Sequence, residues 1–255
     1  MIPMARYDFR TPRLYVDAAL GEGVTVALER EAANYLLNVL RLKAGSEVLL
    51  FNGREGEWRA RLELAGRKAA RLALVERLRA QTPSHDLHYL FAPLKHARLD
   101  YMVQKAVEMG ASRLCPVLTR HTQAERINLG RMRANAIGAA EQCGILTLPE
   151  VAEPVKLDAL IRDWTADRLL VFCDEDAAVK DPVAALAAAR GGGLAGRLPI
   201  SVLVGPEGGF AEEERAALVK LPNIVRLALG PRILRADTAA VAALSLVQAV
   251  LGDWR

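Results

Sequence analysis

The stretch Val202-Leu203-Val204-Gly205-Pro206-Glu207-Gly208-Gly209-Phe210 decides the fold of the C-terminal part of the chain. Its apolar run is typical of a fully buried strand, and the following Ala211-Glu212-Glu213-Glu214 is typical of a helix start. The glycines let backbone approach a ligand closely, and the N–H groups of a helix start attract anionic or polar atoms. Because open α/β sheets hold ligands at the carboxyl ends of their strands, the segment predicts a binding loop. The alternative is a tight strand–helix turn without a ligand.

A second segment of the same kind lies nearer the C-terminus. It reads Leu229-Gly230-Pro231-Arg232-Ile233-Leu234-Arg235-Ala236-Asp237-Thr238-Ala239 and combines a strand end, a Gly-Pro loop and a helix start. Two such loops from neighbouring strands would together wrap one planar ligand, with Arg235 where the second helix begins. Neither loop has the lysine of a P-loop or the glycine spacing of a dinucleotide fingerprint. The pair therefore predicts a ligand site that does not serve nucleotide hydrolysis.

Around these loops, apolar runs alternate with helical patterns. The expected strands are 87–92, 114–118, 169–173, 200–204 and 224–229, and the expected helices are 99–109, 132–142, 183–189, 211–219 and 236–251. Such alternation is typical of a parallel α/β sheet covered on both faces.

The first part of the chain has a different pattern. Short alternating runs at 24–28, 47–51, 58–62 and 70–75, with one helix near 31–39, predict a small β-barrel. Gln81-Thr82-Pro83-Ser84 is the best linker candidate, because Thr-Pro disfavours helix and the segment is polar. We therefore expect two domains, 1–80 and 81–255.

The composition excludes several classes of protein. Hydrophobic residues make up 52% and charged residues 25% of the 255, which excludes a disordered chain. No apolar stretch is long enough for a bilayer and residues 1–13 lack a signal-peptide core, so we expect a cytoplasmic protein. Cys115, Cys143 and Cys173 are odd in number and widely spaced, and the four histidines are scattered, so neither disulfides nor a metal is expected.

The positive charge is concentrated at the start of the chain. Residues 1–80 carry 14 Lys and Arg against 10 Asp and Glu, a difference of +4 that equals the net charge of the whole chain. Residues 95–133 add a stripe of eight basic against three acidic side chains. This distribution favours a polyanion such as RNA as the partner. Solvated basic faces are the alternative.

The two loop segments, in this order near the C-terminus, resemble the RsmE family of the SPOUT class of methyltransferases. The resemblance extends over nearly the whole chain. Its further matching segments are Lys95, 104–111, 113–117, 119–120 and 140–144, together with 34–41 and Gly45, which are similar to the family's PUA-like RNA-binding domain. Asn34, Ile145 and Asp237 depart from the family pattern, which often has His, Arg and Glu there. The Ile145 departure puts one phosphate contact in doubt.

The resemblance implies a fold and an activity. The fold would be a SPOUT trefoil-knot methyltransferase domain with a parallel sheet, preceded by a small PUA-like β-barrel domain. The activity would be S-adenosylmethionine-dependent methylation of N3 of a uridine in 16S rRNA of the small ribosomal subunit. A homodimer packed through the final helix is also implied, because members of this class build each active site at a two-fold interface.

The resemblance also implies which residues form the site. The donor pocket would be lined by Leu203, Val204, Gly205, Glu207, Gly208, Leu229, Gly230, Ile233, Leu234 and Thr238. RNA would be bound by Arg6, Arg10, Arg41, Lys95, Arg98 and Arg120. Because N3 of uracil is a poor nucleophile until its proton leaves, Arg235 is the candidate for stabilising the uracil anion and Glu207 for the base. A helix-start arginine and a capping carboxylate are the structural alternatives.

Two other functions compete with this prediction. The first is a SPOUT methyltransferase with another target, such as a ribose 2′-oxygen or a different base nitrogen. The second is a non-catalytic ribosome-assembly factor that binds RNA. Such a factor would keep the basic first domain but would have no use for two ligand-lining glycine loops.

Overall fold

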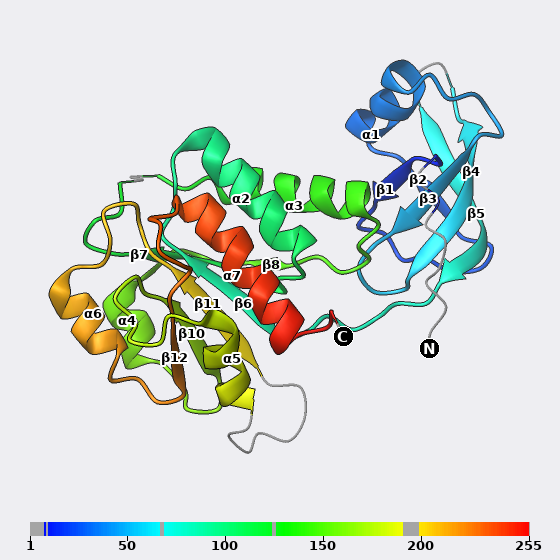
Figure 1. Cartoon of the computed structure of the whole chain (residues 1–255). Helices are drawn as coiled ribbons and strands as arrows, with labels where there is room; N and C mark the ends of the chain where they lie inside the picture. Colours follow the sequence, from blue (N-terminus) through cyan, green and yellow to red (C-terminus); the bar gives the residue numbers. More distant parts are fainter. Residues whose placement is uncertain (1–7, 9, 67–68, 124–125, 191–198, 255) are drawn as a thin grey trace. The chain divides into compact units, whose positions relative to one another are not determined.

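The computed structural model describes residues 8, 10–66, 69–123, 126–190 and 199–254 (Figure 1). Their contacts group into two compact units. The first contains the chain up to Pro83 together with Ala140–Leu148, and the second contains Ser84–Ala139 and the chain from Pro149 onward. The division drawn from the sequence at residue 80 had placed Ala140–Leu148 with the second part.

The first unit is built on a five-stranded sheet. Its strands are β1 (Arg13–Tyr15), β2 (Thr25–Ala27), β3 (Glu47–Phe51), β4 (Glu57–Leu64) and β5 (Ala70–Arg79), in the order β1-β3-β4-β5-β2. β1 pairs parallel to β3, and the other pairs are antiparallel. The expected helix is an α-helical turn, α1 (Arg30–Asn34), continued by a π-helical turn, η1 (Tyr35–Val39).

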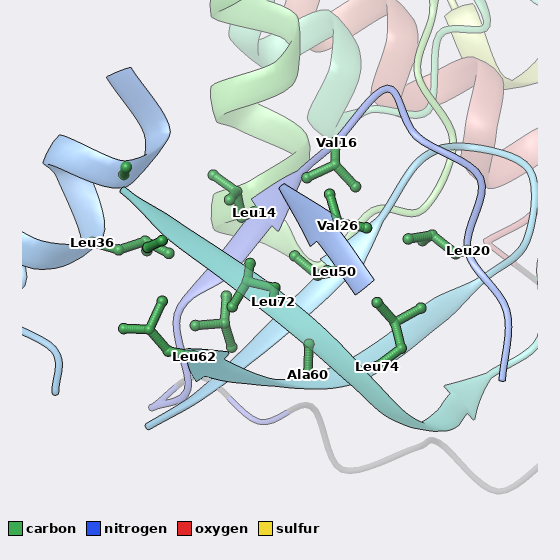
Figure 2. Packing of buried hydrophobic residues seen from close by; sticks show 13 residues of the cluster. Leu14, Val16, Leu20, Val26, Leu36, Leu50, Ala60, Leu62, Leu72 and Leu74 are labelled. Carbon is green, nitrogen blue, oxygen red and sulfur yellow. The ribbon is translucent and has the colours of Figure 1, made fainter. Parts of the chain in front are cut away.

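An apolar cluster fills the concave side of this sheet (Figure 2). It takes alternate residues of the long strands, because successive side chains of a strand point to opposite faces. Ala60 and Leu62 of β4 and Leu72 and Leu74 of β5 are buried, whereas Arg61 between them is exposed. The sheet thus forms the wall of half a barrel, with β1 and β2 as its edges.

The second unit is a parallel α/β sheet. Its strands are β6 (Leu87–Phe91), β7 (Arg113–Leu118), β8 (Glu150–Val151), β9 (Val155–Lys156), β10 (Leu169–Cys173), β11 (Ile200–Val204) and β12 (Ile224–Leu227). The order is β12-β10-β11-β6-β7-β8, with β9 also on β7, and every pair is parallel. The parallel sheet predicted from the alternating pattern is therefore confirmed.

Helices cover this sheet on both faces, as Figure 1 shows. They are α2 (His96–Glu108), α3 (Leu129–Cys143), α4 (Leu157–Arg162), α5 (Pro182–Arg190), α6 (Glu212–Leu218) and α7 (Ala236–Val250). α7 contacts α2, α5 and β11, whereas α4 contacts α6. The last residues of α3 belong to the first unit. None of the helices in the described ranges is long and apolar enough to cross a membrane.

A buried glutamine holds α7 in place beside α2. The Gln248 amide nitrogen donates to the Met109 carbonyl at 2.7 Å, and its oxygen accepts from the Asp253 N–H at 3.1 Å. Gly110, at φ +80°, leaves room for this amide, because a Cβ there would lie 2.5 Å from its nitrogen. The second glycine loop leads into the start of α7, and these hydrogen bonds fix the C-terminal end of the same helix.

Candidate active site at the carboxyl edge of the sheet

Both glycine loops lie at the same edge of the parallel sheet. The first follows β11 and leads into α6, and the second follows β12 and leads into α7. The two strands are not neighbours as expected, because β10 pairs with both and lies between them. Any ligand held by both loops must therefore extend past the end of β10.

Side-chain packing explains why the first loop has a glycine at position 205. The Phe210 ring folds back onto the strand end, so that a Cβ on Gly205 would collide with it. The same ring meets Phe172 of β10 edge to face, with centroids 5.2 Å apart. Gly209 adopts φ +70°, which L side chains rarely adopt. The packing of the Phe210 ring therefore determines the shape of the turn on its inner side, and Glu207 and Gly208 are exposed on its outer side.

A neighbouring loop after β7 is docked on this turn. The Glu214 carboxylate accepts from the N–H of Ala211 at 3.0 Å and from the N–H of Arg120 at 2.8 Å. His121 Nδ1 lies 3.1 Å from the Gly209 carbonyl oxygen. One carboxylate thus closes the start of α6 and holds the segment after β7 beside the first glycine loop.

The second glycine loop is open to solvent. Ile233 is 93% exposed, whereas Leu229 and Leu234 are half-buried. Gly230 adopts φ +94°, and Arg235 is the N-cap of α7 with extended backbone angles and an exposed side chain. Within the described part of the chain the Arg235 guanidinium forms no ion pair.

A single arginine joins the two loops. Arg98, in the first turn of α2, donates from Nε to Asp237 Oδ2 at 3.0 Å and from Nη1 to Glu207 Oε1. The hydrogen bond from Arg98 holds the pKa of Asp237 below its ordinary value. The sequence predicts that Arg98 binds RNA and that Glu207 acts as a base, and the structure pairs the two side chains with each other.

A second cluster, in which one carboxylate binds two arginines, lies at the same carboxyl edge of the sheet. Asp174, which directly follows β10, accepts from Arg226 Nε at 2.6 Å and from Arg215 Nε at 3.2 Å. Burial alone would raise the pKa of Asp174, but the hydrogen bonds from Arg226 and Arg215 outweigh it and lower the pKa. Because Arg226 is on β12 and Arg215 on α6, Asp174 ties together the elements that carry the two loops. Sequence reasoning missed this residue, although its position directly after a buried strand was a usable signal.

The other predicted RNA-binding residues lie on both units. Lys95 is exposed at the N-cap of α2, and the exposed Arg120 lies 3.5 Å from Glu213. On the first unit, Arg10 and Arg41 are exposed, and Arg41 adopts the unusual φ of +56°. Arg6 lies outside the described residues. No group of metal-binding side chains occurs in the parts of the chain that the structure covers.

The fold and this edge define an RNA methyltransferase. A family model described as RNA methyltransferase domain matches residues 80–248, and a model of the RNA methyltransferase PUA domain matches residues 28–75. The chain belongs to this family of RNA methyltransferases.

Particular relatives carry a more specific name. The chain is 27% identical over 237 residues to the ribosomal RNA small subunit methyltransferase E of Rickettsia conorii, covering 92% of this chain and 94% of that protein. Its namesake from Synechocystis sp. is 29% identical over 232 residues, covering 89% and 74%. These relatives confirm the resemblance to the RsmE family.

Solved structures agree with the fold. The ribosomal RNA small subunit methyltransferase E of Neisseria gonorrhoeae, bound to S-adenosyl methionine, is similar with a TM-score of 0.83 and 26% identity, over 96% of this chain and 100% of that one. A Legionella pneumophila protein, in complex with the bound cofactor SAM, is similar with a TM-score of 0.79 and 30% identity, over 94% and 98%. The predicted SPOUT-type α/β fold with a preceding PUA-like domain is thereby confirmed.

Proposed function

We propose that this chain transfers a methyl group from S-adenosylmethionine to N3 of a uridine in 16S rRNA of the small ribosomal subunit. The observation that carries the proposal is the pair of glycine loops held at one edge of a parallel sheet in a chain of this family. The names of the relatives support the rRNA target, and the donor bound in two similar structures supports the cofactor.

The loops offer the donor two kinds of surface. The first loop starts where β11 ends at Val204, and we assign Leu203, Val204, Gly205, Glu207 and Gly208 to its share of the donor pocket. The second loop offers apolar contact from Ile233 and Leu234, the first of which is almost fully exposed. A planar adenine covering Ile233 would remove that apolar surface from water. We assign Leu229, Gly230 and Thr238 to the same pocket.

Arg235 is suited to the chemistry at the uracil ring. Transfer to N3 needs the imide proton to leave, and negative charge then develops on the flanking carbonyl oxygens. An arginine without a carboxylate partner can donate to those oxygens as an oxyanion-hole group does. Arg235 meets this condition within the described residues, whereas Arg98 does not, because two carboxylates already engage it.

Glu207 enters the proposal with a changed role. Its carboxylate accepts from Arg98 Nη1, so it is already paired with a cation before substrate arrives. We therefore assign Glu207 to the donor pocket rather than to removal of the uracil proton.

RNA binding is divided between the two units in this proposal. We assign residues 1–80 to RNA binding through Arg6, Arg10 and Arg41, and residues 81–255 to methyl transfer, with Lys95 and Arg120 as phosphate contacts at the sheet edge. We also propose a homodimer through α7. Its half-exposed side chains, among them Val241, Ala242 and Leu246, form an apolar surface on the chain as it stands.

Nucleoside mass spectrometry of 16S rRNA tests the proposal. Cells lacking the gene should lose 3-methyluridine and regain it with the wild-type chain but not with Arg235→Ala. Arg232→Ala removes an exposed arginine of the same loop and serves as the matched control. Unchanged 3-methyluridine would refute the target, and a 2′-O-methyl or other base change would identify a different one.

A further inference from the structure

Arg98 is placed so that its single side chain reaches residues of both glycine-loop segments. It lies in the first turn of α2, which follows β6, the strand next to β11 at the centre of the sheet. Its guanidinium pairs with Glu207 of the first loop and with Asp237 at the start of α7. Two loops from non-adjacent strands are thereby connected through a third element.

The cluster has acceptors and one donor left for a ligand. Arg98 Nη2 is buried and has no hydrogen-bond partner within the described part of the chain. An unpaired N–H of a charged group is costly, which favours a ligand that supplies an acceptor. The two carboxylates retain lone pairs, since a carboxylate accepts up to about four hydrogen bonds.

The ion pair between Arg98 and Asp237 favours the charged form of both groups. The hydrogen bonds that Arg98 donates to Asp237 and, with a smaller effect, to Glu207 raise the pKa of Arg98, and the bond from Arg98 lowers the pKa of Asp237. One cation and two anions leave one excess negative charge. Such a cluster matches a group that carries both an anionic acceptor and a cationic donor. An α-amino acid end, with its carboxylate and ammonium, has this character.

We propose that Arg98 binds the amino-acid end of the methyl donor: Nη2 donates to its carboxylate, while Nε and Nη1 hold the two loops around it. The inference rests on the proposed function, because it assumes S-adenosylmethionine as the donor. It replaces the role in RNA binding that the sequence analysis expects for Arg98. Glu207 and Asp237 accept from the ammonium group in this arrangement.

Calorimetry with the full chain tests this assignment independently of the RNA target. Arg98→Lys keeps the charge but cannot span both carboxylates and the ligand, so the affinity for S-adenosylmethionine should fall by about tenfold or more. The KM for rRNA should be unchanged. Arg131→Lys is the matched control, because Arg131 pairs with a single carboxylate, Asp100, with 2.8 Å between Nε and Oδ1. It should leave donor affinity unchanged.

A ligand without the carboxylate separates binding from loop positioning. Decarboxylated S-adenosylmethionine should bind the wild type more weakly and should lose little further affinity in Arg98→Lys, since the partner of Nη2 is already gone. Equal losses for both ligands would overturn the assignment and leave only a structural role. A raised KM for rRNA with normal donor affinity would return Arg98 to RNA binding. If the wild type itself binds no S-adenosylmethionine, the proposed function fails before this inference is reached.

Discussion

Two clusters of charged side chains in this chain have opposite arrangements. In the first unit, one carboxylate, Glu57, is shared by Arg13 and Arg79, and the side chains of Glu57 and Arg13 are each only 4% exposed. In the second unit, one guanidinium, Arg98, is shared by Glu207 and Asp237, and Arg98 and Glu207 are 33% and 44% exposed. The first cluster is enclosed in the fold, and the second is partly exposed to solvent.

The enclosed cluster has a structural task that the contacts make plain. Arg13 Nη1 donates to the Glu141 carbonyl at 3.1 Å, and Arg79 Nη2 donates to the Gly144 carbonyl at 2.9 Å. Glu57 thereby attaches the segment 140–148 to the sheet of the first unit. Arg13, like Arg98, leaves a buried Nη2 without a partner in the described residues, so an orphaned N–H alone does not mark a ligand site. The difference is the exposure of the side chain as a whole, which is 4% for Arg13 and 33% for Arg98.

The largest effect is expected from removing the acid at the centre of the enclosed cluster. Glu57→Ala leaves two arginines uncompensated, one of them almost fully buried, which should lower the free energy of unfolding by about 3–5 kcal/mol. Urea unfolding followed by circular dichroism measures the change, and hydrogen exchange should show it in β4 and β5. Glu76→Gln, which removes an exposed partner of Arg59, is the control. A loss as small as the control's would show that Glu57 is dispensable.

A smaller loss is expected at Asp174, which has the same arrangement but more exposed partners. Its own side chain is 3% exposed, whereas those of Arg215 and Arg226 are 25% and 32% exposed and can turn toward water. Asp174→Asn should therefore cost about 1–3 kcal/mol. Because both arginines lie on elements that carry the glycine loops, donor affinity should fall as well. Normal donor binding in a destabilised variant would contradict that link.

The sequence predicts some strands of the structure accurately and misses others. β11 and β3 begin and end at the residues expected, since apolar runs between turn residues are an unambiguous local signal. β8 and β9, with two residues each, and the short β1 were missed, because so few residues show no period. Local pattern also cannot show that the segment 140–148 packs with the first unit.

The candidate site likewise has parts that the sequence predicts and parts that it does not. The two loops were predicted from their glycines and the resemblance, and the structure places both at one edge of the sheet. That β10 separates them was not predictable, because strand order is a property of the whole fold. The pairing of Arg98 with Glu207 and Asp237 joins residues more than a hundred positions apart along the chain. The trefoil knot implied by the resemblance stays a prediction.

Lowering the pH should reveal that Glu57, in the enclosed cluster, has a lower pKa than an ordinary carboxylate. Burial would raise the pKa of Glu57, but hydrogen bonds from Arg79 and Arg13 outweigh it and lower the pKa below the ordinary 4.5. A depressed pKa adds stability that is complete above that value and is lost as the pH falls through the folded-state value. The free energy of unfolding should thus fall more steeply below about pH 4.5 in the wild type than in Glu57→Gln. Parallel curves would show that Glu57 does not titrate in this range.

The smallest effect is expected from an exposed cluster with the same stoichiometry as that of Arg98. Arg59 on β4 lies 2.8 Å from Glu76 and 3.6 Å from Glu47, with all three side chains at least 36% exposed. Exposed pairs contribute little, so Arg59→Lys should change the free energy of unfolding by less than about 1 kcal/mol.

This variant also tests what distinguishes Arg98. Both arginines serve two carboxylates, but Arg59 lies on the β4 strand of the first unit, outside the sheet edge that carries the glycine loops. Arg59→Lys should therefore leave the affinity for S-adenosylmethionine at the wild-type value in the calorimeter, whereas Arg98→Lys should not. If both substitutions weakened donor binding equally, the effect would follow from replacing any two-carboxylate arginine by lysine, and position at the loops would no longer explain it.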